Sequence, residues 1–321
     1  MSGNSVILKP SPQTPTIVEH VYEAFQTAGL PEGVLQYFHT GSPEIVRRFV
    51  QHNQIKLICF TGSLLGGMAI REAAKSRIVP ILLELGGKDP AYVRSDVDIA
   101  WAAGEIVDGA IFNSGQSCCS LERIYVDEKI HDEFVDNVRA VLEKYIVGDP
   151  MDPKAHVGPV ISPASKRLIE SHVAEAISSG AKRVTVPNAT FEQMPKVGNY
   201  VAPTVLTDVN HEMKVMTEET FGPVIPIMRV KSDAEAIDLM NDSEFGLTAS
   251  IWTKDIDRGE ELANQIEAGT CFVNRCDYPS PDLAWTGFNT NSGMGASLSC
   301  FGFDAYTKPQ SMHIKSYPGS T

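Results

Sequence analysis

The sequence has few cysteines, and its six thiols, at positions 59, 118, 119, 271, 276 and 300 of 321 residues, are not spaced as pairs. They form no Cys-x-x-Cys motif and no zinc-like arrangement, so we expect neither a disulfide framework nor a metal site. This cysteine usage favours a reducing compartment, the cytoplasm. No run of apolar residues approaches the length of about 18 that a membrane-spanning helix needs.

Basic residues are also in the minority. The chain has 27 Lys and Arg against 40 Asp and Glu, a formal net charge of −13 and an isoelectric point near 5.1. This balance argues against nucleic acid or an anionic membrane as the main partner. The first residues, MSGNSVILK, have no charged region ahead of a long apolar stretch, so they do not read as a secretory signal.

What the sequence does have is a regular alternation of short apolar runs and amphipathic segments over its first 90 residues. We expect strands at 5–9, 34–38, 55–60 and 78–85, and helices at 14–29, 43–52 and 63–75. Strands that alternate with helices predict parallel βαβ units in a doubly wound sheet, and therefore an α/β fold.

The pattern changes after residue 90. We expect helices at 96–112, 131–145, 165–180, 233–242 and 257–269, and strands at 123–128, 224–230 and 249–253. A loop of small residues, 113–120, separates the first of these helices from the first strand. The strand-like segment 311–317 has no element after it, so we expect it to pair outside its own domain.

Seven segments spread over the whole chain resemble the aldehyde dehydrogenase family, in the family's order. They are VILKPSPQTP, FTGS, LELGGKDP, FNSGQSCCSLERIYV, EETFGPVIPI, FGLTASIWTKD and AWTGFNTNSGMG. The resemblance implies oxidation of an aldehyde to a carboxylic acid through a cysteine thioester, with hydride passing to NAD or NADP.

The resemblance also implies a division of the α/β fold into three parts. Residues 1–88 correspond to the carboxy-terminal half of a Rossmann-like cofactor domain, 89–290 to an α/β catalytic domain, and 291–321 to a return segment with an oligomerisation strand. Such strands extend a neighbour's sheet in the family, so a homo-oligomer, dimer or tetramer, is expected.

Cys118 occupies the family's nucleophile position, in a Gly- and Ser-rich loop just after a predicted helix. Small side chains leave room there, and backbone amides can approach a reacting oxygen. The thiolate is the reactive form of cysteine. A Cys-Cys dipeptide alone is more often a packing feature, but its place within GQSCC favours catalysis. Cys119 is then a structural or redox neighbour.

Glu84 ends an apolar strand immediately before Gly-Gly, the edge of a parallel sheet where ligands bind. A carboxylate beside an apolar wall has a raised pKa and can act as the base for the water that hydrolyses a thioester. The alternative is an ordinary surface carboxylate. Relatives that transfer the acyl group to coenzyme A usually lack this glutamate, so Glu84 favours hydrolysis.

Five further residues match cofactor-binding positions of the family. Lys9 follows the first strand, near the expected adenosine ribose. Gly62 and Ser63 open a helix, whose N-terminal amides attract a pyrophosphate. Glu219 and Phe221 match positions that hold the nicotinamide ribose and ring. Each residue alone would be unremarkable: a solvated lysine, a common turn, a surface glutamate.

The sequence departs from the family in three places. The family carries further chain before VILKP, including an asparagine that donates to the reacting oxyanion, a contact worth on the order of 3 kcal/mol. Pro12 stands where many NAD-preferring relatives have a glutamate, so NADP is not excluded. Ala296 and Ser297 replace Arg-Glu, removing a second proton-handling group. The alternative is therefore a truncated, catalytically impaired relative that acts through oligomerisation or has no function. The aldehyde itself is not indicated.

Overall fold

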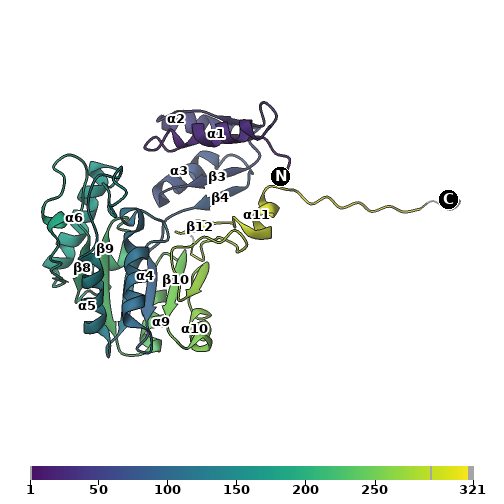
Figure 1. Ribbon diagram of the computed structural model, residues 1–321. Coiled ribbons are helices and arrows are strands. Elements are labelled where there is room, and N and C mark those ends of the chain that lie inside the picture. Colours follow the sequence, from purple (N-terminus) through teal and green to yellow (C-terminus); the bar gives the residue numbers. More distant parts are fainter. Residues whose placement is uncertain (1, 290, 317–321) are drawn as a thin grey trace.

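The structure is a computed structural model that describes residues 2–289 and 291–316, and it has three sheets (Figure 1). Two of them are small. Strands β1 (Val6–Leu8) and β2 (Leu35–Tyr37) form a parallel pair, and β3 (Ile58–Thr61) pairs in parallel with β4 (Ile81–Glu84). Helices α1 (Ile17–Thr27), α2 (Pro43–Gln51) and α3 (Leu64–Ala74) alternate with these strands, as the sequence predicts.

A late segment of the chain returns to the second small sheet. Strand β12 (Gly293–Met294) pairs antiparallel with β4, so that Gly293 lies opposite Glu84. Helix α11 (Ser299–Ala305) follows, and Figure 1 shows β12 and α11 between the N-terminal helices and the large sheet. Residues close to the C-terminus therefore help to build the edge at which Glu84 lies.

The third sheet has seven strands in the order β11-β10-β5-β6-β9-β8-β7. Its strands are β5 (Asp89–Val93), β6 (Leu121–Asp127), β7 (Lys182–Arg183), β8 (Thr204–Thr207), β9 (Val224–Val230), β10 (Thr248–Trp252) and β11 (Thr270–Val273). Every neighbouring pair is parallel except β7 and β8. The expectation of an α/β fold with a mainly parallel sheet is confirmed. The doubly wound sheet expected over the first 90 residues is instead divided between two small sheets, one with β1 and β2 and the other with β3 and β4.

Helices cover both faces of the seven-stranded sheet. Helices α4 (Ile99–Ile111) and α5 (His131–Leu142) pack on one face, and α6 (Pro163–Ser178), α8 (Lys214–Thr217), α9 (Asp233–Asn241) and α10 (Ile256–Ala263) on the other. Consecutive residues of β5 alternate between them: Ala91 and Val93 join the first core, and Tyr92 joins the second. Burial on both faces explains why all seven residues of β6 are buried.

The element bounds differ from the sequence expectation where a local signal outweighs periodicity. Helix α4 begins at Ile99 because the Asp98 carboxylate caps it, accepting from the Trp101 amide at 3.1 Å. The predicted strand at 78–85 begins only at Ile81, after Pro80. The predicted helix at 257–269 ends at Ala263, since the chain must turn before β11.

Several short elements were missed. Strand β5 begins Asp-Pro, a pair that argues against a central strand, and its register with β6 shifts between Asp89 and Pro90 to accommodate the proline. Strands β7, β8, β11 and β12, helices α7 (Ala189–Glu192) and α8, and the 3₁₀ turn η1 (Phe112–Gly115) are the others.

The segment predicted as an oligomerisation strand, 311–317, is extended but unpaired over its described part. Residues 311–316 form no strand with any described residue, and Tyr317 lies outside the described range. Its role in pairing with another subunit stays a prediction. Within the described residues, no helix combines the length and apolarity that crossing a membrane requires.

Candidate active site

The loop that carries Cys118 has an unusual backbone. Between the end of α4 and Gln116, the residues Asn113, Ser114 and Gly115 have φ values of 52°, 61° and 72°, a run in the left-handed region. A side chain at Gly115 would also collide, since its Cβ would lie 2.3 Å from the Gly222 carbonyl oxygen. Glycine is therefore required where the Cys118 loop touches the loop that leads into β9.

The two adjacent thiols of this loop have different surroundings. The Cys119 thiol donates to Oδ1 of Asp277 at 2.8 Å, and the Ser117 hydroxyl donates to the same oxygen at 2.9 Å. The neighbouring Cys119 thiol lowers the pKa of Cys118, against the opposing effect of burial. The same interaction, with burial and Asp277, raises the pKa of Cys119. Cys118 is thus the thiol of the pair that ionises more readily.

Gly86 and Gly87 bring a carboxylate close to this loop. A Cβ on Gly87 would lie 2.3 Å from the Cys118 carbonyl oxygen, and a Cβ on Gly86 would lie 2.5 Å from Oε1 of Glu219. The Gly87 amide donates to Glu219 at 3.1 Å. Burial, followed by the nearby Glu122 charge, raises the pKa of Glu219 to about 7. The structure therefore brings Cys118 and Glu219 together across the Gly-Gly turn.

Glu84 lies at the carboxyl end of β4, two residues before that turn. Its backbone is fixed by β3 and β12, and its carbonyl accepts from the Gly62 amide at 3.0 Å. Burial raises the pKa of Glu84, and a hydrogen bond from Ser297 opposes that rise. The Ser297 hydroxyl donates to Oε1 of Glu84 at 2.5 Å. Among the described residues, no hydrogen bond joins Glu84 to Cys118.

Phe221 is held by a buried ion pair that the sequence did not predict. The Lys88 ammonium, 1% exposed, donates to Oε2 of Glu122 at 2.6 Å. The same carboxylate accepts from the Thr220 amide at 2.7 Å and the Phe221 amide at 2.8 Å. Two amides and an ammonium on one carboxylate hold Phe221 in its left-handed conformation, with φ of 51°.

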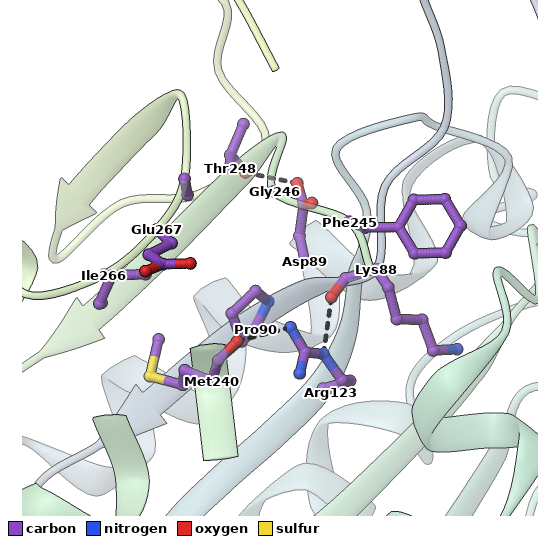
Figure 2. A pocket seen from close by; sticks show the side chains of 11 residues that line it. Lys88, Asp89, Pro90, Arg123, Met240, Phe245, Gly246, Thr248, Ile266 and Glu267 are labelled. Atoms are coloured by element: carbon purple, nitrogen blue, oxygen red, sulfur yellow. Dashed lines mark hydrogen bonds between the residues drawn. The ribbon is translucent and has the colours of Figure 1, made fainter. Parts of the chain in front are cut away.

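A small cavity lies beside this pair, lined in part by Lys88, Asp89 and Arg123 (Figure 2). Its volume of about 10 Å³ is close to the minimum for a single water molecule, far too small for a substrate. Arg123 donates to the Lys88 carbonyl at 2.7 Å, and the Asp89 carboxyl bonds to Thr248. This cavity is a structural feature behind the site.

The other predicted cofactor residues lie at the two small sheets. Lys9 follows β1, and its ammonium donates to the Pro10 carbonyl. The residues after it help to line a cavity of about 280 Å³ at the carboxyl ends of β1 and β2, bounded by Pro10, Ser11, Pro12, Pro15, His39, Thr40 and Gly41. His39 and Thr40 are polar lining residues that the sequence did not predict as part of a cofactor site.

Gly62 and Ser63 form the turn between β3 and α3. A Cβ on Gly62 would meet the Phe60 ring at 2.8 Å, and the Ser63 hydroxyl caps α3 by accepting from the Gly66 amide at 3.2 Å. Both residues are exposed. The structure thus brings Cys118 together with Glu219, and Glu84 together with Ser297, whereas Lys9 and the Gly62 turn lie at the ends of strands of two different sheets. Within the described part of the chain, no hydrogen bond joins Lys9 to the Gly62 turn.

Comparison with known proteins gives one consistent family. Residues 1–312 match the model of the aldehyde dehydrogenase family. A probable betaine aldehyde dehydrogenase of Schizosaccharomyces pombe is 35% identical over 307 residues, which are 96% of this chain and 61% of that protein.

Solved structures agree. An NAD-dependent aldehyde dehydrogenase from Sinorhizobium meliloti superposes with a TM-score of 0.90 at 31% identity, covering 99% of this chain and 63% of that one. An NADP-dependent glyceraldehyde-3-phosphate dehydrogenase from Bacillus halodurans, complexed with NADP, superposes with a TM-score of 0.85 at 37% identity, covering 95% and 62%. The chain spans between 50% and 64% of the length of the curated relatives it matches.

Proposed function

The chain belongs to the aldehyde dehydrogenase family, and from this premise we propose that it oxidises an aldehyde to a carboxylic acid with NAD or NADP, through a thioester on Cys118. The observation that carries the proposal is the asymmetry of the paired thiols. Cys119 is held by Asp277, and the pKa of Cys118 is lowered beside it. A thiol of lowered pKa in a loop of small residues is suited to nucleophilic attack.

In the first half of the proposed reaction, the Cys118 thiolate attacks the aldehyde carbon. A carbon–sulfur bond forms and the carbonyl oxygen becomes an oxyanion, which backbone amides of the Cys118 loop can stabilise. The oxyanion re-forms its double bond as hydride leaves the carbon, and the thioester remains on Cys118. When bound, the nicotinamide group supplies the acceptor for that hydride.

In the second half, water hydrolyses the thioester with Glu84 as base. Glu84 takes a proton from the water, the hydroxide adds to the thioester carbonyl, and the carbon–sulfur bond breaks to return the Cys118 thiolate. Burial raises the pKa of Glu84, which makes the carboxylate a stronger base than an exposed glutamate. The unprotonated form is required, so hydrolysis should accelerate as pH rises through that raised pKa.

The residues present fit a dinucleotide. The 280 Å³ cavity after β1 and β2 is lined in part by Ser11, His39 and Thr40, polar residues suited to an adenosine ribose or its phosphate, and Lys9 directly precedes the lining residue Pro10. Gly62 and Ser63 begin α3, where amides and the helix dipole favour a phosphate. Gly86 and Gly87 leave no room for a Cβ, because Glu219 and the Cys118 carbonyl lie directly against them, so this turn keeps Glu219 close to the nucleophile loop. We assign the nicotinamide end of the cofactor to Glu219 and Phe221.

A second candidate function is supported by a specific observation. Val6 and Ile7 of β1 are each 46% exposed, and the two small sheets are not joined by hydrogen bonds among the described residues. A family member with this exposed apolar surface can act through association with further chains, its catalysis impaired. The proposed domains, 1–88, 89–290 and 291–321, and a homo-oligomeric assembly are common to both candidates.

Turnover with an aldehyde panel separates the two candidates. Formation of NAD(P)H together with the matching carboxylic acid, abolished by Cys118→Ala, supports the enzyme. Cys300→Ala is the matched control, because it removes an exposed thiol outside the proposed site and should leave turnover unchanged. Absence of product from the parent protein with NAD and with NADP would favour the non-catalytic candidate.

A further inference from the structure

Ser297 is anchored in a way that directs its hydroxyl at Glu84. Its backbone forms a two-bond bridge with Trp285: the Trp285 amide donates to the Ser297 carbonyl at 2.7 Å, and the Ser297 amide donates back at 2.8 Å. Trp285 is buried, 9% exposed, and it packs with Cys119. The serine is thereby fixed to the same apolar cluster that supports the nucleophile loop.

The partner of this hydroxyl is fixed from the other side. Glu84 ends β4, where Thr61 and Gly293 flank it on neighbouring strands. The next residue is tied to the returning segment as well, since the Leu85 amide donates to the Ser292 carbonyl at 3.1 Å. Glu84 and Ser297 are 213 residues apart in sequence, yet the Glu84 backbone is held in a strand ladder and the Ser297 backbone in a β-bridge, so both ends of their contact are anchored.

The contact uses only one oxygen of the carboxylate. Oε1 of Glu84 accepts from Ser297, whereas Oε2 has no hydrogen-bond partner among the described residues. A carboxylate held at one oxygen has restricted rotation, while its other oxygen stays available to a water molecule. Few titratable groups lie next to it: the Tyr306 hydroxyl feels the Glu84 charge, and Cys59 contacts Tyr306 at 3.5 Å.

We propose that Ser297 is a positioning residue for Glu84 in thioester hydrolysis. Its hydroxyl binds Oε1, fixes the orientation of the carboxyl group, and leaves Oε2 to take the proton of the hydrolytic water. The proposal rests on the proposed function, because it assigns Ser297 a role only if Glu84 is the base. It also gives the serine that replaces a family glutamate a function of its own.

Hydrolysis of an acyl group on Cys118 can be followed without any cofactor. p-Nitrophenyl acetate acylates a reactive thiolate and releases p-nitrophenolate in a burst, and the later steady rate reports deacylation. We would measure both phases across pH for the full chain and for the variants Ser297→Ala, Ser297→Thr and Glu84→Gln. Ser299→Ala is the matched control, because among the described residues the Ser299 hydroxyl accepts one hydrogen bond, from the Phe301 amide, and none from Glu84.

Ser297→Ala should leave the burst unchanged and slow deacylation about threefold to tenfold on the acidic side of the profile, the factor that one hydrogen bond of ordinary net strength represents. Removing a donor to the carboxylate disfavours its charged form, so the rising limb should move to higher pH. Ser297→Thr keeps the hydroxyl and should restore both properties. Ser299→Ala should match the parent.

The outcomes distinguish a failure of the proposed function from a failure of the role of Ser297. If Glu84→Gln deacylates at the parental rate, or the parent gives no burst, the proposed function itself fails and this inference with it. If Glu84→Gln stalls but Ser297→Ala keeps the parental pH profile and rate, only the role of Ser297 is overturned. Equal slowing by Ser297→Ala and Ser297→Thr, with no movement of the limb, would also overturn it, since that pattern indicates packing alone.

Discussion

At the scale of single residues, the six cysteines should differ widely in reactivity. The pKa of Cys118 is lowered by its neighbour, whereas burial raises the pKa of Cys271 to about 11 and that of Cys276 to about 12. Brief treatment with a low dose of iodoacetamide, followed by peptide mass spectrometry, should therefore label Cys118 ahead of these two. Faster labelling of Cys276 than of Cys118 would remove the basis for an activated nucleophile.

A second prediction at this scale concerns Lys9 and the choice of cofactor. Pro12 brings no carboxylate to the cavity after β1, and none of its lining residues is acidic, so a 2′-phosphate there would not face a lining carboxylate. Lys9, three residues before Pro12, is the basic residue closest to it in the sequence. Lys9→Ala should weaken NADP binding more than NAD binding, by roughly 1–2 kcal/mol for a lost charge-assisted contact. Calorimetric titration measures both, with Lys56→Ala as a control on a different surface. An equal loss for the two cofactors would contradict a 2′-phosphate role.

At the scale of elements, the turn after β4 should tolerate no side chain. Gly87→Ala would place a Cβ 2.3 Å from the Cys118 carbonyl, and overpacking of this kind costs about 1–3 kcal/mol. We expect a lower melting temperature and a changed rate of Cys118 alkylation. Gly104→Ala is the matched control: it lies within α4 with nothing near its Cβ, so alanine should stabilise the helix by about 0.5–1 kcal/mol. Parental stability and thiol reactivity in Gly87→Ala would show that the loops are not in contact.

The helices and strands also show how much of the fold could be predicted from the sequence. Alternating strands and helices predicted the parallel sheets because periodicity is a local signal, and most helices lie within a few residues of their expected bounds. Strand β5 was not predicted, because Asp89 and Pro90 argue against a strand and only tertiary pairing overrides that preference.

The residues of the candidate site also divide into those that the sequence predicts and those that only the structure reveals. Cys118, Glu84 and Glu219 stand in motifs that are contiguous in sequence, so the resemblance could select them. The contacts of Ser297 with Glu84 and of Asp277 with Cys119 span 213 and 158 residues, and no local pattern encodes them. Glu122 was not predicted as a site residue, because the role of a carboxylate inside an apolar strand depends on its tertiary contacts. Here those contacts are Lys88 and two backbone amides.

At the scale of the whole molecule, the seven-stranded sheet is covered on both faces, and the N-terminal sheets are not. Val6 and Ile7 of β1 are each 46% exposed, and Ile17 and Phe25 of α1 are 59% and 50% exposed. Exposed apolar strands and helices associate. The chain should therefore elute from size-exclusion chromatography at an apparent mass well above the 35.0 kDa of one chain. Replacing Val6 and Ile7 by lysine should shift elution towards the monomer. A monodisperse monomer from the parent chain would contradict this expectation.

The central claim is that Cys118 carries the acyl group and that Glu84 removes it, and one measurement tests both parts. Glu84→Gln is incubated with an aldehyde and NAD or NADP, and the masses of the intact protein and of its peptides are measured by mass spectrometry. We predict one acyl group on Cys118, formed only when the oxidised cofactor is present, accumulating in Glu84→Gln and absent from the parent because hydrolysis keeps pace. No adduct in the variant, or an adduct on a cysteine other than Cys118, would contradict the account.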